Sequence, residues 1–393
     1  MKFGIDAIGF YTPGYFLDLE ILAKANKTVL ADDKSGFGIK RMSVLPPYED
    51  VITMAANAVA ELIDEPGFSE VAMIMFATES GVDCSKSAAL YLHNFFGFTS
   101  QCRIIELKQA CYGTTWGLQL AISWLKHNPG KKALLVASDH AVYQSGSQAE
   151  LSGGCGAVAM LISANPRLFE IEATSGIYTA ETMDFWHPVG LDYALVNGKL
   201  SCETYLDFLN KTWQQYQLLT GRKFTDHQRF CYHAPLTKLV EVAHRRLAKL
   251  SGIKYSREQA AEKVRSSLCY KQEVGNCYCA SLYLSLLSLL DNDDSELTDK
   301  LIGLYSYGSG STAEFFAARV IKGYKEHSRL FLHRQLLADR LELSLEQYRV
   351  FAKTWSSSLE NLRLLPDIKN FSGRFFLKEI KNYRRFYEKV AAS

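Results

Sequence analysis

Apolar and polar positions along the chain follow two periods, one typical of strands and one typical of helices. Short apolar runs rich in β-branched and aromatic residues predict buried strands. These runs are Phe3–Tyr11, Val71–Thr78, Ala133–Ala137, Ala157–Ile162, Leu168–Ala173, Phe230–His233 and Leu301–Tyr307. Segments with helical periodicity lie between them: Tyr48–Asp64, Cys111–His127, Glu203–Leu219, Pro235–Leu250, Arg257–Tyr270 and Asn276–Leu290. The alternation predicts an α/β protein with largely parallel sheets that are covered on both faces.

The predicted strand-helix units fall into two similar halves. They occupy residues 1 to about 165 and again about 166 to 320. Each half has a helix that starts at a Cys or Asn after a Gly- or Ala-containing turn, in "ACYGTT" and "GNCYCAS". We therefore expect an N-terminal half, 1–165, and a C-terminal half, 166–393. The tail from about 321 is charged and rich in Tyr and Phe, and we expect it to form a helical extension over the core.

Charge and hydropathy exclude several classes of protein. The chain has 393 residues and a net charge of +2, from 44 basic and 42 acidic side chains. This balance gives no overall field for nucleic acid or an anionic membrane. The longest apolar helical run, Ala280–Leu290, is about half a membrane span. No segment resembles a targeting signal, so we expect a cytoplasmic protein that binds neither nucleic acid nor membrane.

The cysteines do not suggest a disulfide framework or a metal site. There are nine, an odd number without regular spacing, and most are expected to be reduced thiols. Cys277 and Cys279 form a C-x-C pair, but no partner pair and no histidines at metal-ligand spacing accompany them. We predict no metal site.

Cys111 lies at the junction between a short apolar segment and a regular helix. A helix start offers free N–H groups and a positive dipole end, so a thiol there is expected to lose its proton more easily and to act as a nucleophile. The same N–H groups suit an oxyanion on an attacked carbonyl. A buried cysteine that merely packs at a helix start is the alternative.

Three further stretches end predicted strands in reactive or polar groups. Glu79 follows one buried strand, His233 ends a second, and Gly308-Ser309-Gly310 ends a third. Open α/β sheets present active groups at the carboxyl ends of their strands. A carboxylate and a neutral imidazole there suit proton transfer. Each feature alone also fits a solvated acid, a core histidine or an ordinary turn.

Together these stretches resemble a known family. The motifs are "TESGVDCSKSAALYLH", "ELKQACYGTT", "ALLVASDHAVY", "GGCGAVAMLIS", "MDFWHP", "YHAPLTK", "VGNCYCASLYL" and "SYGSGSTAEFF". In this order they resemble the bacterial 3-hydroxy-3-methylglutaryl-CoA (HMG-CoA) synthases of the thiolase-like superfamily. The match covers roughly residues 1 to 320 and continues loosely into the tail.

The resemblance implies a thiolase-like fold of two similar βα halves in an α/β/α/β/α arrangement. It also implies condensation of acetyl-CoA with acetoacetyl-CoA in the mevalonate pathway. Cys111 would carry the acetyl group as a thioester, and Glu79 would remove a proton from its methyl. His233 would orient the acetoacetyl thioester and polarise its ketone. CoA thioesters would be substrates, no cofactor would be needed, and the protein would form a homodimer.

Other site residues follow from the same motifs. Asn276 matches a position that contacts the acyl group, and Ser309 one whose main-chain N–H serves the oxyanion. Further matches lie near the reacting groups, the CoA or the acyl product: Tyr112, Asp139, Tyr143, Asp184, Phe185, Ser152, Ser201 and Lys238.

Four positions depart from the family pattern: His187, Leu236, Val242 and Cys279. These positions change the contacts expected to the CoA phosphates and the pantetheine. Arg245 or Arg246 would compensate for the lost contacts. Two alternative functions stay open. One is a β-branching synthase of polyketide assembly lines with a carrier-protein donor, and the other is a non-catalytic scaffold with a thiolase fold. An intact Glu79, Cys111 and His233 argues against the scaffold.

Overall fold

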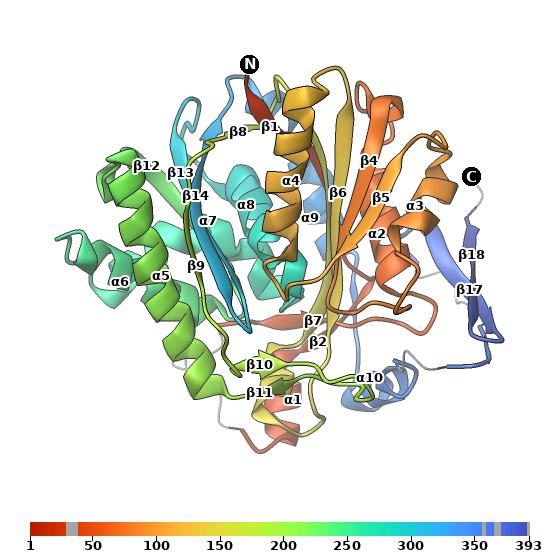
Figure 1. Cartoon of the computed structure of the whole chain (residues 1–393). Helices are drawn as coiled ribbons and strands as arrows, with labels where there is room; N and C mark the ends of the chain where they lie inside the picture. The colour runs from red at the N-terminus through yellow and green to blue at the C-terminus, as the bar shows by residue number, and fades with distance from the viewer. Residues whose placement is uncertain (29–37, 356–358, 365–370, 391–393) are drawn as a thin grey trace.

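A mixed ten-stranded sheet forms the centre of the molecule in the computed structural model, which describes residues 1–28, 38–355, 359–364 and 371–390 (Figure 1). The strand order is β12-β13-β14-β8-β1-β7-β6-β4-β5, and β9 pairs with β14 beside this path. The strands are β1 (Phe3–Tyr11), β4 (Val71–Ala77), β5 (Arg103–Leu107), β6 (Lys132–Ala141), β7 (Gly154–Ala164), β8 (Phe169–Ile171), β9 (Gly176–Thr179), β12 (His227–Tyr232), β13 (Leu301–Gly308) and β14 (Thr312–Val320).

Antiparallel pairs make up much of this sheet. β4 is parallel to β5 and β6, and β12 is parallel to β13. β7 is antiparallel to β6 and β1, and β14 is antiparallel to β13 and β8. The expectation of a largely parallel sheet is therefore wrong. β6–β7 and β13–β14 are joined without an α-helix, and such direct connections give antiparallel pairs.

The same pattern of strands occurs twice. The series β4-β6-β7-β1 has one parallel pair followed by two antiparallel pairs, and the series β12-β13-β14-β8 repeats it. Helix α4 (Gly113–His127) precedes β6, and α8 (Ser281–Asn292) precedes β13. β8 also pairs with β1, which joins the two halves into one sheet.

Side chains from successive strand positions enter different cores. On β4, Met75 lies in a core with α4 and α8, whereas Ile74 lies in a core with α2 (Val51–Ala60) and α3 (Ala89–Phe96). On β13, Ile302 joins the core with α4 and α8, and Tyr305 joins a third core with α5 (Gly198–Thr220), α6 (Thr237–Leu250) and α7 (Arg257–Val274). The helices and strands thus form five layers with α4 and α8 in the middle (Figure 1), so the predicted α/β/α/β/α fold is confirmed.

Local capping explains where several helices begin. The Asp50 carboxylate accepts the N–H groups of Ile52 and Thr53 at the start of α2, and Ser256 with Gln259 forms a capping box at the start of α7. The expected helix start at Pro235 is wrong. Leu236 has extended backbone angles, so α6 begins two residues later.

Small elements surround the sheet. Strands β2 (Tyr15–Asp18), β3 (Arg41–Ser43) and β15 (Leu341–Glu342) form a separate sheet near α1 (Leu19–Ala25), and β10 (Phe185–Trp186) pairs with β11 (Leu195–Val196). Tyr143, just past β6, forms an isolated bridge with Ala194. None of the helices in the described residues has the length and apolar character needed to cross a membrane.

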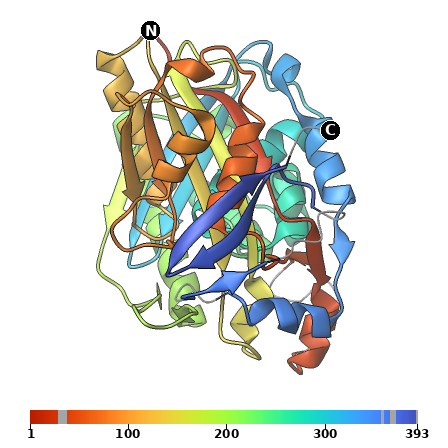
Figure 2. The ribbon, with the colours of Figure 1, turned by 90° about the vertical axis from the view of Figure 1, so that its right-hand side faces the viewer.

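The tail is only partly helical. It contains α9 (Leu330–Ala338) and α10 (Leu345–Ala352), but β16 (Leu362–Arg363), β17 (Phe375–Lys381) and β18 (Arg384–Lys389) form a sheet. Figure 2 shows the β17–β18 hairpin lying across the outside of the molecule. Phe375 stacks on Phe95 of α3, and Arg385 pairs with Asp50 at 3.1 Å. The prediction of a helical extension is therefore wrong for this hairpin.

A buried ionic group ties α9 to the core and makes stability depend on pH. His333 Nδ1 lies 2.7 Å from Asp291 Oδ2, and Nε2 lies 3.4 Å from Glu61 Oε2. Burial alone would lower the pKa of His333, but the hydrogen bonds to Asp291 and Glu61 raise it to about 9. A raised pKa stabilises the fold fully below the unfolded value of about 6.5, and this stabilisation is lost as pH rises through about 9.

We therefore expect His333→Gln to lower the free energy of unfolding by about 3 kcal/mol at about pH 6 and by clearly less at about pH 10. Denaturant unfolding at the two pH values measures this difference. Lys24→Gln, which removes an exposed ion pair with Glu20, is the control and should change stability little at either pH. An equal loss for His333→Gln at both pH values would contradict the assignment of a charged His333.

Candidate active site

Cys111 and Glu79 meet at the carboxyl ends of two neighbouring strands. β4 ends at Ala77, two residues before Glu79, and β5 ends at Leu107, shortly before Cys111. Because β4 and β5 are parallel, their following loops emerge at the same edge of the sheet. The Cys111 thiol donates a hydrogen bond to Glu79 Oε1 across 2.9 Å. A thiol and a carboxylate are thus in direct contact.

Asp139 fixes the backbone around Glu79. Its Oδ1 accepts the N–H groups of Glu79 and Ser80 at 2.7 and 3.1 Å and the Thr78 hydroxyl at 2.8 Å. Its Oδ2 accepts the N–H of Cys279 at 3.0 Å. This fully buried carboxylate therefore connects the end of β4 with the segment before α8 and holds Glu79 in place.

Burial makes both members of the Cys111–Glu79 pair weak acids. Burial, followed by the negative charge of Asp139, raises the pKa of Glu79. Burial, followed by the negative charge of Glu79, raises the pKa of Cys111 well above its ordinary value. The expectation that the helix start makes this thiol more acidic is therefore wrong, because lost hydration and the nearby carboxylate outweigh the helix dipole. A carboxylate with a raised pKa is also a stronger base.

A close approach of two loops brings Ser309 beside Cys111. A Cβ atom on Gly308 would lie 2.6 Å from both the Gln109 carbonyl oxygen and Tyr112 Cβ. Only glycine therefore allows the turn between β13 and β14 to pass so close to the cysteine loop. Ser309 follows directly and lines the same cavity as Cys111.

A second close approach positions Asn276. Gly275 has φ +83°, and a Cβ atom there would lie 2.0 Å from the Gly153 carbonyl oxygen. The Asn276 N–H donates to the carbonyls of Ser152 and Gly153, each at 3.2 Å. Its Nδ2 donates to the Tyr143 hydroxyl at 3.4 Å. The predicted residues Asn276, Ser152 and Tyr143 therefore form one connected wall.

His233 lies just past β12 as a buried, neutral imidazole. The main-chain N–H of His233 donates to the Tyr305 carbonyl at 2.7 Å, and its main-chain carbonyl accepts the Tyr205 hydroxyl at 2.8 Å. Burial, and then the positive charge of Lys271, lowers the pKa of His233 to about 3. Its Nδ1 is buried without a hydrogen-bond partner among the described residues. This ring can therefore hydrogen-bond a ligand in the cavity.

One cavity of about 580 Å³ collects most of the predicted residues. Its walls include eight of them: Cys111, Tyr143, Ser152, Phe185, Ser201, His233, Asn276 and Ser309. Residues from both halves of the sheet contribute, so the site lies between the halves. Such a volume suits a small organic ligand.

Besides Glu79 and Asp139, three predicted residues lie outside the lining of this cavity. The Tyr112 hydroxyl donates to buried Glu314 at 2.7 Å. Asp184 accepts the Tyr307 hydroxyl, the Ser201 hydroxyl and the Gly310 N–H at 2.7, 3.2 and 3.0 Å. Asp184 thus holds two residues that line the cavity, Tyr307 and Ser201, by hydrogen bonds. The remaining residue, Lys238, forms a 3.3 Å ion pair within α6.

Sequence similarity decides which family this site belongs to. Residues 1–167 match the N-terminal family model of hydroxymethylglutaryl-coenzyme A synthase, and residues 244–390 match the C-terminal model. A hydroxymethylglutaryl-CoA synthase from Enterococcus faecalis is 37% identical over 98% of this chain and 100% of its own. The chain belongs to the hydroxymethylglutaryl-CoA synthase family. It is therefore an enzyme of the acyl-CoA condensing type.

The names of two similar proteins specify different acyl carriers, an acyl carrier protein (ACP) in one and CoA in the other. A polyketide biosynthesis 3-hydroxy-3-methylglutaryl-ACP synthase from Bacillus subtilis is 33% identical over 99% of each chain. A crystal structure of an HMG-CoA synthase complexed with CoA matches with a TM-score of 0.91 and 33% identity, covering 99% of this chain and 100% of that one. Similarity alone therefore does not separate a CoA-dependent from a carrier-dependent synthase.

The departures from the family pattern lie at different places around the site. Cys279 Sγ donates to the Ala110 carbonyl at 3.2 Å, and Leu236 lines the cavity. His187 Nε2 lies 2.7 Å from the Leu191 carbonyl oxygen, outside the main cavity. Val242 is exposed, and Arg246 bonds Asn210 on α5 at 3.2 Å.

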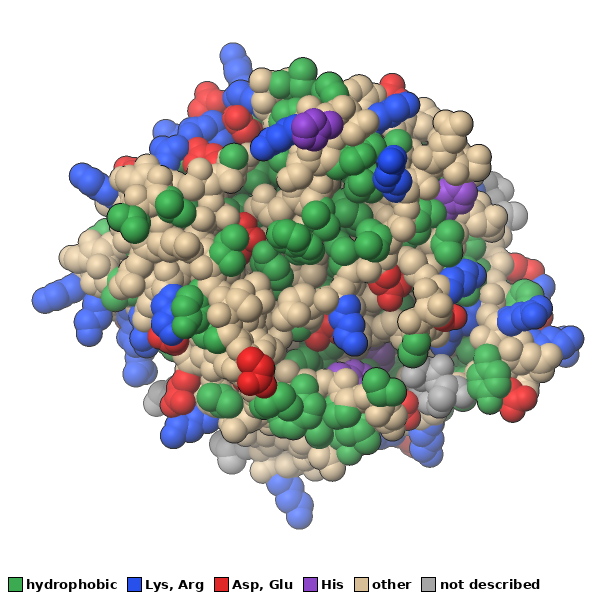
Figure 3. Space-filling model, viewed as in Figure 1, with side chains coloured by type: hydrophobic (Ala, Val, Ile, Leu, Met, Phe, Trp, Pro, Cys, Tyr) green, Lys and Arg blue, Asp and Glu red, His purple; other side chains and the backbone are tan. Residues whose placement is uncertain are grey.

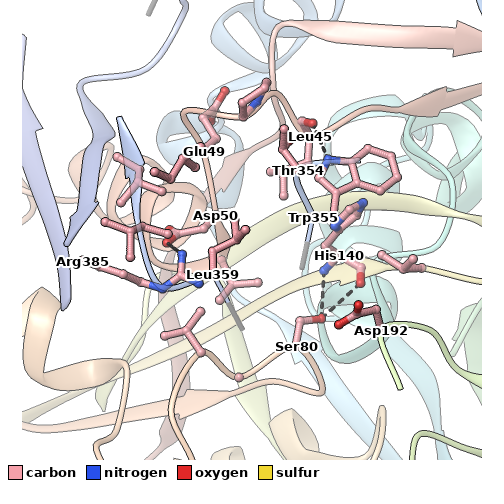
Figure 4. Close-up of a pocket in the computed structure, with 18 of the residues that line it drawn as sticks. Leu45, Glu49, Asp50, Ser80, His140, Asp192, Thr354, Trp355, Leu359 and Arg385 are labelled. Carbon is pink, nitrogen blue, oxygen red and sulfur yellow. Dashed lines mark hydrogen bonds and ion pairs between the residues drawn. The ribbon is translucent and has the colours of Figure 1, made fainter. Parts of the chain in front are cut away.

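A second cavity of about 140 Å³ adjoins Glu79 (Figure 4). Its walls include Ser80 and His140, joined by a 3.1 Å hydrogen bond from the His140 N–H to the Ser80 hydroxyl. Asp192 and Trp355 also border it. Tyr278 lines both cavities, so this tyrosine lies between them. No group of three or more His, Cys, Asp or Glu within the described residues is arranged to hold a metal ion.

The sequence patterns missed several residues of this site. The main cavity is also lined by three tyrosines, Tyr205, Tyr278 and Tyr307. Lys271 donates a hydrogen bond to Asn276 Oδ1. The tyrosines occur in predicted core segments, where an aromatic side chain is ordinarily packing. Lys271 lies in a helix with many charged residues, where a lysine is ordinarily exposed. Periodicity gives no signal for either.

Proposed function

We propose that this synthase condenses acetyl-CoA with acetoacetyl-CoA and water to give HMG-CoA and CoA through an acetyl-Cys111 intermediate. The observation that carries the proposal is the 2.9 Å contact between Cys111 Sγ and Glu79 Oε1. It lies beside a cavity that also contains the neutral His233. A scaffold without catalytic activity has no need of these three groups together.

Acetyl transfer is the first step. The Cys111 thiolate attacks the thioester carbonyl of acetyl-CoA, CoA leaves as a thiol, and the acetyl group remains on sulfur. The main-chain N–H of Ser309, a residue that lines the same cavity as Cys111, would stabilise the oxyanion that forms. The thiol proton has an acceptor in Glu79.

Carbon–carbon bond formation follows. Glu79 removes a proton from the methyl of acetyl-Cys111, and the carbanion attacks the ketone carbon of acetoacetyl-CoA. Burial raises the pKa of Glu79, which makes it a stronger base for this weak carbon acid. His233 donates a hydrogen bond to the ketone oxygen, and the proton that Glu79 took from the methyl passes to this oxygen, which becomes a hydroxyl. Water then cleaves the thioester to Cys111 and releases HMG-CoA with a new carboxylate.

We infer that the acetyl donor is free acetyl-CoA, which would assign the enzyme to the mevalonate pathway of isoprenoid synthesis. Both donors present the same pantetheine arm, so the catalytic groups do not distinguish them. Residue Leu239 of α6 lines the cavity, and the same helix carries Lys238, Arg245 and Arg246. These cations suit nucleotide phosphates, but a basic helix would also dock an acidic carrier protein. Support for CoA therefore comes from the resemblance of "VNGKLSCETYL" to mevalonate-type enzymes.

The donor is tested by comparing rates of Cys111 acetylation. Acetyl-CoA and acetylated acyl carrier proteins are supplied at equal concentration, and the acetyl-enzyme is measured by intact mass. We expect acetyl-CoA to be the faster donor. A carrier preference of about tenfold or more, about 1.4 kcal/mol in transition-state free energy, would instead assign the enzyme to polyketide β-branching.

The homodimer that the family resemblance implies stays a prediction, and the exposed edge of the sheet supports it. β5 pairs only with β4 among the described strands. Ile105 on β5 is 49% exposed and Trp116 on α4 is 47% exposed. Figure 3 shows hydrophobic side chains gathered across the middle of the face viewed in Figure 1. A second copy would cover such a surface, and a monomeric mass in sedimentation analysis would exclude it.

A further inference from the structure

Lys271 is a buried cation without a carboxylate partner. Its side chain in α7 is fully buried, and no ion pair in the described part of the chain includes it. Its Nζ donates to the Gly275 carbonyl at 2.6 Å, and to Asn276 Oδ1 and Ser281 Oγ at 3.3 Å each. An unpaired buried ammonium group is costly. The end of α7 offsets part of this cost, because carbonyls at a helix C-terminus attract a cation.

These contacts determine how the Asn276 carboxamide is oriented. Asn276 Oδ1 accepts hydrogen bonds from Lys271 Nζ, from Ser281 Oγ at 2.9 Å and from the Tyr278 N–H at 3.1 Å. Lys271 and the Tyr278 N–H can only donate, so a flipped amide would put two donors against them. The orientation is thus fixed by chemistry, and Nδ2 is left to face Tyr143 and the cavity.

The charge of Lys271 also reaches the reacting groups. Against the dominant effect of burial, Lys271 favours the anionic form of the Cys111 thiol. After burial, it is the second influence that keeps His233 neutral. Burial lowers the pKa of Lys271 to about 8, which leaves the ammonium form predominant at neutral pH.

We propose that Lys271 is a positioning residue of this active site, which fixes the Asn276 amide as a donor toward the acyl group and places a positive charge behind the cavity wall to which Asn276 and Cys111 both belong. The inference rests on the proposed function only for the role of Asn276 toward the acyl group. The effect of the Lys271 charge on the Cys111 thiol does not depend on any substrate.

The test is Lys271→Met, which removes the charge and the donor but keeps a long unbranched side chain. Iodoacetamide alkylation of Cys111, followed by peptide mass across a pH series, measures the thiol without substrate. We expect the pH profile to move to higher pH, with alkylation about three- to tenfold slower at a given pH. We expect kcat/KM for condensation to fall about tenfold.

Lys132→Met is the matched control, because that lysine is also mostly buried but pairs with Asp6 at 2.7 Å, away from the cavity. It should lower stability without moving the Cys111 profile. An unchanged profile in folded Lys271→Met would overturn the inference about charge. Absence of an acetyl-enzyme in the wild type would instead count against the proposed function.

A second variant tests the positioning role even if Lys271→Met does not fold. Ser281→Ala removes one hydrogen bond to Asn276 Oδ1 and keeps the charge. We expect slower condensation with an unchanged Cys111 profile. In an Asn276→Ala background, Ser281→Ala should have no further effect on condensation. Fully additive losses in the double variant would overturn the positioning role.

Discussion

Replacement of Cys111 by alanine is expected to abolish acetyl transfer from acetyl-CoA and, with it, all formation of HMG-CoA. Cys279, a described thiol near Cys111, donates to the Ala110 carbonyl and does not line the main cavity. Burial and nearby carboxylates also raise its pKa well above the ordinary value. Cys202 of α5 also lines the main cavity, but among the described thiols it is Cys111 that donates a hydrogen bond to Glu79. We therefore expect no other thiol to replace it.

Intact mass after incubation with acetyl-CoA measures this loss. Cys155→Ala is a matched control, because that thiol is fully buried and lies in the core with α2. Its acetylation should equal that of the wild type if it folds. Acetylation of Cys111→Ala at the wild-type level would identify another residue as the nucleophile.

Glu79→Gln is expected to separate the two half-reactions. Condensation should slow by about 10²–10⁴-fold, because an amide does not take a proton from the acetyl methyl. Acetylation should persist, because loss of the carboxylate removes a negative charge that raises the pKa of Cys111. The thiolate then forms by exchange with solvent.

Rapid-quench measurements of acetyl-enzyme and HMG-CoA distinguish these steps. Glu106→Gln is a suitable control, since this partly buried carboxylate bonds the Ala88 N–H and lies outside the main cavity. It should leave both steps near wild-type rates. Near-normal turnover of Glu79→Gln would end the proposal that Glu79 is the base.

Strong local patterns in the sequence predicted much of the fold. β1 was expected at Phe3–Tyr11 and has these bounds, because a short continuous run of apolar residues is typical of a buried strand. The β17–β18 hairpin was missed, since its alternating apolar and charged residues are dispersed among many charges. Periodicity also could not predict the direction of the strands, because the direct β6–β7 and β13–β14 connections determine it.

The candidate site divides in the same way. Strand-end positions indicated Glu79 and His233, a helix start indicated Cys111, and family resemblance supplied the surrounding residues. The acidity of Cys111 was predicted in the wrong direction, because a helix dipole is a local feature whereas burial depends on the whole fold. Lys271 could not be predicted, since its burial results from packing between α7, the Gly275 turn and α8.

The central claim is that carbon–carbon bond formation occurs on an acetyl group carried by Cys111. The most direct test is a single turnover in which isotope-labelled acetyl-enzyme, freed of acetyl-CoA, is mixed with acetoacetyl-CoA. Peptide mass first locates the label, and product mass follows its fate. The account predicts label on Cys111 and then in HMG-CoA. Label that stays on the protein while unlabelled HMG-CoA forms, or label on a different residue, would contradict it.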